Sequence, residues 1–129
     1  MANILVITNE AILLVLISTT LRLDGHTVVA LSDPLEALES EVAPQPPIDL
    51  LVTDIEMKPI SGFELVTRLT KTGFTGPVLF SSGYPSLSSI VSASLGSRSI
   101  LEKPFTAAQL RVAVRSALTR DRRKPSVAA

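Results

Sequence analysis

The chain has 129 residues, a length that fits one domain whose hydrophobic core needs no disulfide or metal. Twelve basic residues balance twelve acidic ones and 46% of the residues are apolar, which argues against disorder and against a nucleic-acid-binding charge over the whole chain. Cysteine is absent, which excludes disulfides and cysteine-based metal sites and fits a reducing compartment. The longest apolar run, residues 11–17, is much shorter than the roughly 20 residues of a membrane span, and it lacks the flanks of a secretory signal. We therefore expect a cytoplasmic protein without membrane contact.

Short apolar runs alternate along the chain with segments of helical character. The apolar runs predict five strands: residues 3–8, 27–31, 48–53, 77–80 and 98–101. The segments that follow them predict five helices: residues 10–23, 34–42, 62–72, 85–95 and 107–120. Because parallel strands need crossover connections, this alternation predicts an α/β domain with a parallel sheet and helices on both faces. The domain is expected over residues 1–120, followed by a flexible, basic tail over residues 121–129.

Several helices have identifiable starts or faces. Asp33 before Pro34, Ser61 and Thr106 are the expected N-caps of three helices. The residues of the first helix that are expected to face the sheet are Leu13, Leu16, Ile17 and Leu21. That phase leaves Leu14 and Val15 on the solvent side as a patch for a protein partner, and a different burial phase is the alternative. The last helix and tail hold half of the basic residues, which we interpret as a solvated face, since no DNA-reading motif follows.

Three of the predicted strands stop at residues that suit phosphoryl chemistry. Asp54 follows the third strand, the serines at 81 and 82 follow the fourth, and Lys103 follows the fifth. Ligands of doubly wound sheets bind outside the carboxyl ends of the strands, so these side chains, with Thr8 and Asn9 after the first strand, are expected to share one edge. A carboxylate nucleophile beside a hydroxyl and an ammonium could accept a phosphoryl group, because the other two groups stabilise the transferred oxygens.

These features resemble the response-regulator receiver domains of two-component signalling, the CheY-like superfamily. The matching fragments are Asp54 with Gly62 eight residues later, the serine-containing segment 78–84, and Lys103-Pro104-Phe105 after the fifth strand. Their order and spacing cover about residues 3–120. The resemblance implies a flavodoxin-like fold, a three-layer (βα)5 sandwich with a five-stranded parallel sheet in the order 2-1-3-4-5.

The resemblance also implies a function and its residues. Asp54 would be the phosphoacceptor, loaded by a histidine kinase, a histidine phosphotransfer protein or a small phosphodonor. The family alignment selects Ser82 over Ser81 as the hydroxyl that contacts the phosphoryl group, and Lys103 would bind another phosphoryl oxygen. A magnesium ion would complete the site, and the output would be contact with a downstream effector protein. The domain would not be an enzyme in the ordinary sense, and a homodimer stays open.

Two departures from the family pattern concern the metal and the output. Thr8 and Asn9 stand where receivers carry two acidic residues, so Mg²⁺ should bind weakly or not at all. The remaining metal-ligand candidates are the amide oxygen of Asn9, the carboxylate of Asp54 and the backbone carbonyl of Glu56, while Glu10 is expected to cap the first helix unless a loop shift brings it in. Ile100 replaces the aromatic residue whose rotation accompanies phosphorylation in the family.

The prediction is therefore a receiver that works without an output domain of its own. The main alternative is a degenerate receiver that binds partners without being phosphorylated, which the neutral Thr8 and Asn9 would favour. A phosphatase of the haloacid-dehalogenase type is less consistent with the sequence, because that family places its nucleophile after the first strand and needs paired acids late in the chain. A nucleotide-binding fold lacks support as well, since no glycine-rich loop follows the first strand.

Overall fold

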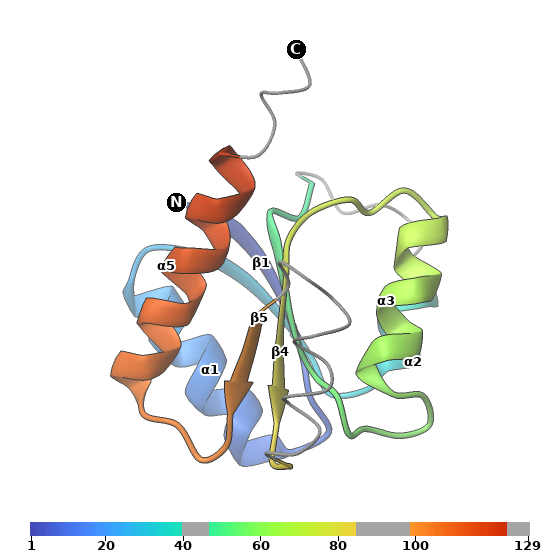
Figure 1. Cartoon of the computed structure of the whole chain (residues 1–129). Helices are drawn as coiled ribbons and strands as arrows, with labels where there is room; N and C mark the ends of the chain where they lie inside the picture. Colours follow the sequence, from blue (N-terminus) through green and yellow to red (C-terminus); the bar gives the residue numbers. More distant parts are fainter. Residues whose placement is uncertain (40–46, 85–98, 124–129) are drawn as a thin grey trace.

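The computed structural model describes residues 1–39, 47–84 and 99–123, and the strands of this part form one parallel sheet in the order β2-β1-β3-β4-β5 (Figure 1). The strands are β1 Asn3–Ile7, β2 Thr27–Leu31, β3 Leu50–Asp54, β4 Val78–Ser82 and β5 Ser99–Glu102. The helices are α1 Ala11–Leu23, α2 Pro34–Glu39, α3 Gly62–Lys71 and α5 Ala107–Arg123. The helix predicted over residues 85–95 and the end of the one predicted over residues 34–42 lie outside the described residues.

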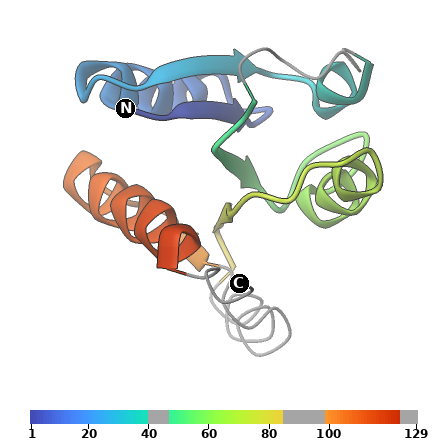
Figure 2. The same ribbon diagram turned by 90° about the horizontal axis from the view of Figure 1, so that it is seen from above.

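The sheet is the middle layer of three. Helices α1 and α5 cover one face, and α2 and α3 cover the other (Figure 2). Each face has its own apolar core because successive side chains of a buried strand point to opposite sides. Ile4 and Val52 pack with Ile17 of α1 on one side, while Leu51 and Phe80 belong to the core beneath α3. The predicted flavodoxin-like α/β fold and its strand order are confirmed.

Helices α3 and α5 begin at the side-chain caps that the sequence predicted. Ser61 accepts a hydrogen bond from the backbone N–H of Glu64 at 3.2 Å at the start of α3. Thr106 and Gln109 form a reciprocal capping box at the start of α5, with distances of 3.0 and 2.8 Å. Helix α1 ends before Gly25, whose φ of 94° is accessible to glycine at little cost. These caps fix the helix starts independently of the core.

The burial phase of α1 differs from the predicted one. Ile17 and Leu21 are buried as expected, but Leu14 packs against the core and Leu16 is 38% exposed. The sequence assignment was therefore wrong for Leu14 and Leu16, and the alternative phase holds. Because α1 is apolar nearly all round, its periodicity does not specify which side faces the sheet. The apolar residues that it exposes are Ile12, Val15, Leu16 and Leu23.

Helix α5 is longer than predicted, since it continues to Arg123 into the segment assigned to the tail. Residues 124–129 lie outside the described part of the chain. Within the described ranges, no helix is both long and apolar enough to cross a membrane.

Candidate functional site

Polar residues gather at the edge of the sheet where four strands end. They are Thr8 after β1, Asp54 at the end of β3, Ser81 and Ser82 at the end of β4, and Lys103 after β5. The strand register determines which of them meet. Asp54 is the register partner of Ser81, and residues paired in this way on neighbouring parallel strands point to the same face. Ser82, one residue later, points to the opposite face of β4.

The carboxylate of Asp54 is almost completely enclosed, with 1% of the residue exposed. Thr8 donates its hydroxyl proton to Oδ2 at 2.6 Å, and Ser81 donates to Oδ1. The Nζ atom of Lys103 lies 3.1 Å from Oδ2. A buried carboxylate is costly unless it is paired and hydrogen-bonded, and these three donors meet that requirement. Both oxygens of this enclosed carboxylate therefore have partners at the sheet edge.

Lys103 is shared between two carboxylates. Its ammonium lies 2.7 Å from Oε2 of Glu10 as well as 3.1 Å from Asp54. Burial acts to lower the pKa of Lys103, but the hydrogen bond to Glu10 and the charge of Asp54 together outweigh it and raise that pKa above its ordinary value. Lys103 therefore stays cationic at neutral pH. Glu10 occupies the N-cap position of α1 without a side-chain cap bond, so the expected capping role of its carboxylate is wrong.

The Ser82 side chain contacts Glu56 and not Asp54. The Ser82 hydroxyl donates to Oε2 of Glu56 at 2.6 Å and accepts a hydrogen bond from the backbone N–H of Tyr84 at 3.1 Å. The other Glu56 oxygen lies 3.4 Å from the backbone nitrogen of Gly83. The serine selected by the family alignment is thus engaged with a carboxylate, and Ser81 is the serine that contacts Asp54.

The side chains of Asn9, Asp54 and Glu10, which were candidates for binding Mg²⁺, are engaged with protein groups. Asn9 uses its Oδ1 to accept from the backbone N–H of Lys58 at 2.8 Å, and its Nδ2 donates to the carbonyl of Ser32 at 2.9 Å. Among the residues that the structure describes, no group of three or more His, Cys, Asp or Glu side chains could hold a metal. Mg²⁺ prefers carboxylate and water oxygens in near-octahedral geometry. Thr8 and Lys103 occupy one Asp54 oxygen instead, so this donor set does not fit the ion.

Thr8 and Ser81 were expected at this edge of the sheet, but their hydrogen bonds to Asp54 were not predicted. The Thr8 hydroxyl accepts from the backbone N–H of Glu10 at 3.1 Å, which directs its single proton to Asp54. Ser81 contacts Asp54 because the two residues are register partners on neighbouring strands. The sequence alone did not fix that register, so it could not place Ser81 opposite Asp54.

Gly62 lies against the backbone of Asp54 at the start of α3. A Cβ atom at this position would come within 2.1 Å of the Asp54 carbonyl oxygen, and that oxygen cannot move away because it belongs to β3. Gly62 also donates its N–H to the carbonyl of Ile55 at 2.9 Å. The spacing of eight residues between Asp54 and Gly62 therefore has a steric basis: only glycine allows α3 to start so close to the site.

Comparison with known proteins gives relatives over nearly the whole chain. It is 33% identical to the transcriptional regulatory protein SpaR of Bacillus subtilis over 95% of this chain and 54% of the relative. It is 29% identical to the regulatory protein VanRc of Enterococcus gallinarum over 94% of this chain and 52% of the relative. The chain thus spans about half the length of these curated relatives.

Solved structures agree with this result. A response regulator receiver protein from Sinorhizobium medicae superposes with a TM-score of 0.76 at 36% identity, covering 92% of this chain and 94% of that one. A receiver domain protein from Clostridium thermocellum gives a TM-score of 0.80 at 30% identity, covering 95% and 98%. The family model for the response regulator receiver domain matches residues 4–115, and the chain therefore belongs to the response regulator receiver domains.

Proposed function

We propose that this receiver domain accepts a phosphoryl group on Asp54 and signals by binding other proteins. The observation that carries the proposal is the enclosed Asp54 carboxylate with the Lys103 ammonium 3.1 Å away at the carboxyl edge of the sheet. A nucleophilic carboxylate needs a nearby cation to stabilise the transferred oxygens, and Lys103 is one. A scaffold would have no physical need to bury this pair.

The transfer itself needs few groups. An Asp54 oxygen forms a bond to phosphorus while the bond between phosphorus and the donor atom breaks, and the donor leaves with that electron pair. Lys103 stabilises the phosphoryl oxygens, and Ser82 donates to another of them once it has left Glu56. Because only 1% of Asp54 is exposed, a donor reaches it after neighbouring side chains turn aside. Loading is therefore coupled to a rearrangement at the sheet edge.

Receivers of this family generally use Mg²⁺, but here hydroxyl groups and an ammonium group stabilise the Asp54 carboxylate. Thr8, Ser81 and Lys103 already stabilise the carboxylate, and they do so without a second acid. We therefore expect the loading of Asp54 to depend weakly on Mg²⁺.

The partners follow from the family. A histidine kinase or a histidine phosphotransfer protein is the proposed phosphodonor, and a downstream effector protein is the proposed target. The related SpaR and VanRc are regulatory proteins by name, which supports a role in regulation rather than in metabolism. Any activity of the domain's own would be limited to its phosphorylation and dephosphorylation, and a cytoplasmic location remains a prediction from the sequence.

Intact-mass measurement after incubation with acetyl phosphate or phosphoramidate tests the proposal. We expect a phosphoryl adduct on the wild-type protein, with and without Mg²⁺, and none on Asp54→Asn. An adduct that persists in Asp54→Asn would place the phosphoryl group elsewhere. A folded wild-type protein that gains no adduct from either donor, or from histidine kinases of its own organism, would overturn the proposal in favour of a phosphorylation-independent binding module.

A further inference from the structure

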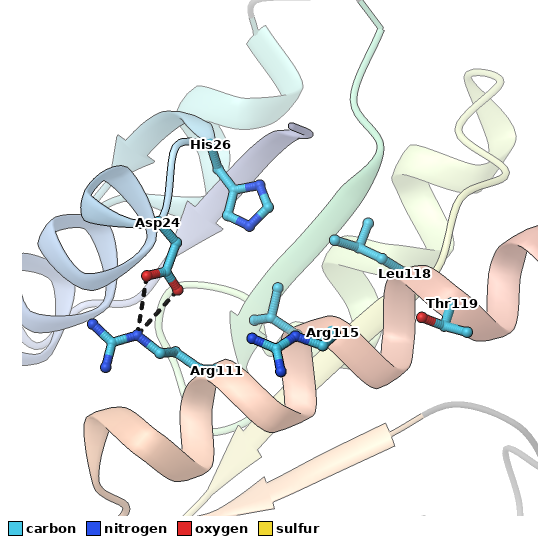
Figure 3. Close-up of a pocket in the computed structure, with 7 residues that line it drawn as sticks. Asp24, His26, Arg111, Arg115, Leu118 and Thr119 are labelled. Atoms are coloured by element: carbon cyan, nitrogen blue, oxygen red, sulfur yellow. Dashed lines mark hydrogen bonds and ion pairs between the residues drawn. The ribbon is translucent and has the colours of Figure 1, made fainter.

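A polar groove lies between helix α5 and the turn that joins α1 to β2 (Figure 3). Its volume is about 390 Å³, within the range of small-molecule sites. The residues that line it are Asp24, His26, Arg111, Val114, Arg115, Leu118 and Thr119. It lies at the edge where β2 begins, directly after His26, whereas Asp54 ends β3 at the opposite edge of the sheet. The groove is therefore separate from the phosphoacceptor site.

Hydrogen-bond donors outnumber acceptors along the groove. Arg111 uses its Nε to contact both carboxylate oxygens of Asp24 at 3.1 and 3.0 Å, which leaves its terminal N–H groups free of that pair. Arg115, on the next turn of α5, is exposed and makes no hydrogen bond or ion pair with any other residue in the described part of the chain. Two arginines and one carboxylate thus line the groove, which gives it a net positive charge.

His26 adds a donor on the opposite wall. Its Nδ1 accepts a hydrogen bond from the backbone N–H of Ala2 at 3.1 Å, which assigns the proton of the neutral ring to Nε2. The ring extends from the α1–β2 turn toward the residues of α5 (Figure 3). Thr119 supplies a hydroxyl at the far end of the groove, and Val114 and Leu118 give it an apolar floor.

We propose that this groove binds a small organic phosphate. A phosphoryl group has three oxygens that accept hydrogen bonds, and it matches two arginine side chains one helical turn apart and an imidazole N–H better than a carboxylate with two oxygens does. The apolar floor would hold a hydrophobic or ring-bearing part of the same molecule. Within the described part of the chain, the acid that lines the groove is Asp24, and Arg111 neutralises it, so it does not repel such a ligand strongly.

NMR titration of the full chain with phenylphosphonate tests this site. The C–P bond of that probe cannot transfer its phosphoryl group, so Asp54 is not modified during the measurement. We expect saturable amide shifts at the α1–β2 turn and along α5, and tighter binding than that of inorganic phosphate because the ring contacts the apolar floor. Shifts that centre on Asp54, absence of saturation, or equal binding of the two probes would overturn the proposal.

A matched pair of variants separates a built site from general charge attraction. Arg115→Gln and Arg68→Gln remove the same charge, but Arg68 lies on α3, across the sheet, in an exposed pair with Glu64. We expect Arg115→Gln to weaken phenylphosphonate binding about tenfold, the size of one charge-assisted hydrogen bond, and Arg68→Gln to leave it nearly unchanged. Equal weakening by both variants would show that only net charge matters. The titration does not use phosphorylation, so its failure leaves the proposed role of Asp54 untouched.

Discussion

Thr8 gives the buried carboxylate of Asp54 a hydrogen bond where a second acid would bring a negative charge. The Thr8 hydroxyl lies 2.6 Å from Oδ2 of Asp54, and both residues are almost completely shielded from water. A carboxylate at the same place would repel Asp54 strongly, because two like charges in such contact cannot both stay ionised without a cation between them. The identity of residue 8 thus decides how much the site depends on a metal.

Replacing Thr8 by Asp is therefore expected to create a metal requirement. Without metal, the Thr8→Asp protein should be less stable than wild type by about 1–3 kcal/mol, since a donor is lost and a charge is buried. Mg²⁺ should restore much of that loss, because two adjacent carboxylates are suitable ligands. Thermal unfolding with and without MgCl₂ measures both effects. Thr8→Val, which also loses the hydrogen bond, should show no response to Mg²⁺, and a strong response of wild type would contradict the prediction.

The sequence showed which residues lie at the carboxyl edge of the sheet more readily than it showed which of them are in contact. The sequence placed Asp54 and Lys103 at strand ends, and the structure brings them within 3.1 Å. The family alignment pointed to Ser82, and the sequence did not show that Ser81 would contact Asp54, because the register with β3 depends on tertiary pairing. The pairing of Ser82 with Glu56 was missed for the same reason.

Among the helices, the starts of α3 and α5 could be predicted from the sequence, but the buried face of α1 could not. Ser61 and Thr106 cap their helices through local hydrogen bonds, which depend on a few neighbouring residues. The orientation of α1 depends on packing against β1 and α5, and its apolar residues leave several rotations equivalent in sequence. The partial burial of Leu14 and the exposure of Leu16 therefore became visible only in the folded molecule.

The start of helix α3 leaves no room for a side chain at Gly62. Gly62→Ala would push a methyl group against the Asp54 carbonyl, displacing the start of α3 or the end of β3. We expect a loss of about 1–3 kcal/mol in the free energy of unfolding, as for other overpacked sites. Gly83→Ala is the matched control, because a Cβ there meets nothing within 4 Å. Chemical denaturation of both variants measures the difference, and equal stabilities would refute the steric role of Gly62.

Across the whole molecule, Lys103 links three parts of the fold. It follows β5, contacts Asp54 at the end of β3, and pairs with Glu10 at the start of α1. The alternation of strands and helices was enough to predict a parallel sheet with helices on both faces, and the family resemblance implied its strand order, which the structure confirms. It could not predict the ion pair between Lys103 and Glu10, which joins residues 93 positions apart through the ends of two elements.

This linkage makes global stability depend on pH in the alkaline range. The folded state raises the pKa of Lys103 above its ordinary value of 10.5, so the native protein holds this proton more tightly than the unfolded chain does. The resulting stabilisation is complete below the ordinary pKa and is lost as the pH rises through the higher native one. Urea unfolding of wild type and Lys103→Met between about pH 8 and pH 11 isolates the contribution, because the other titrating groups are common to both proteins. The stability of wild type should fall more steeply than that of Lys103→Met near the top of this range, and parallel curves would mean that Lys103 is no more basic in the folded protein than in the unfolded chain.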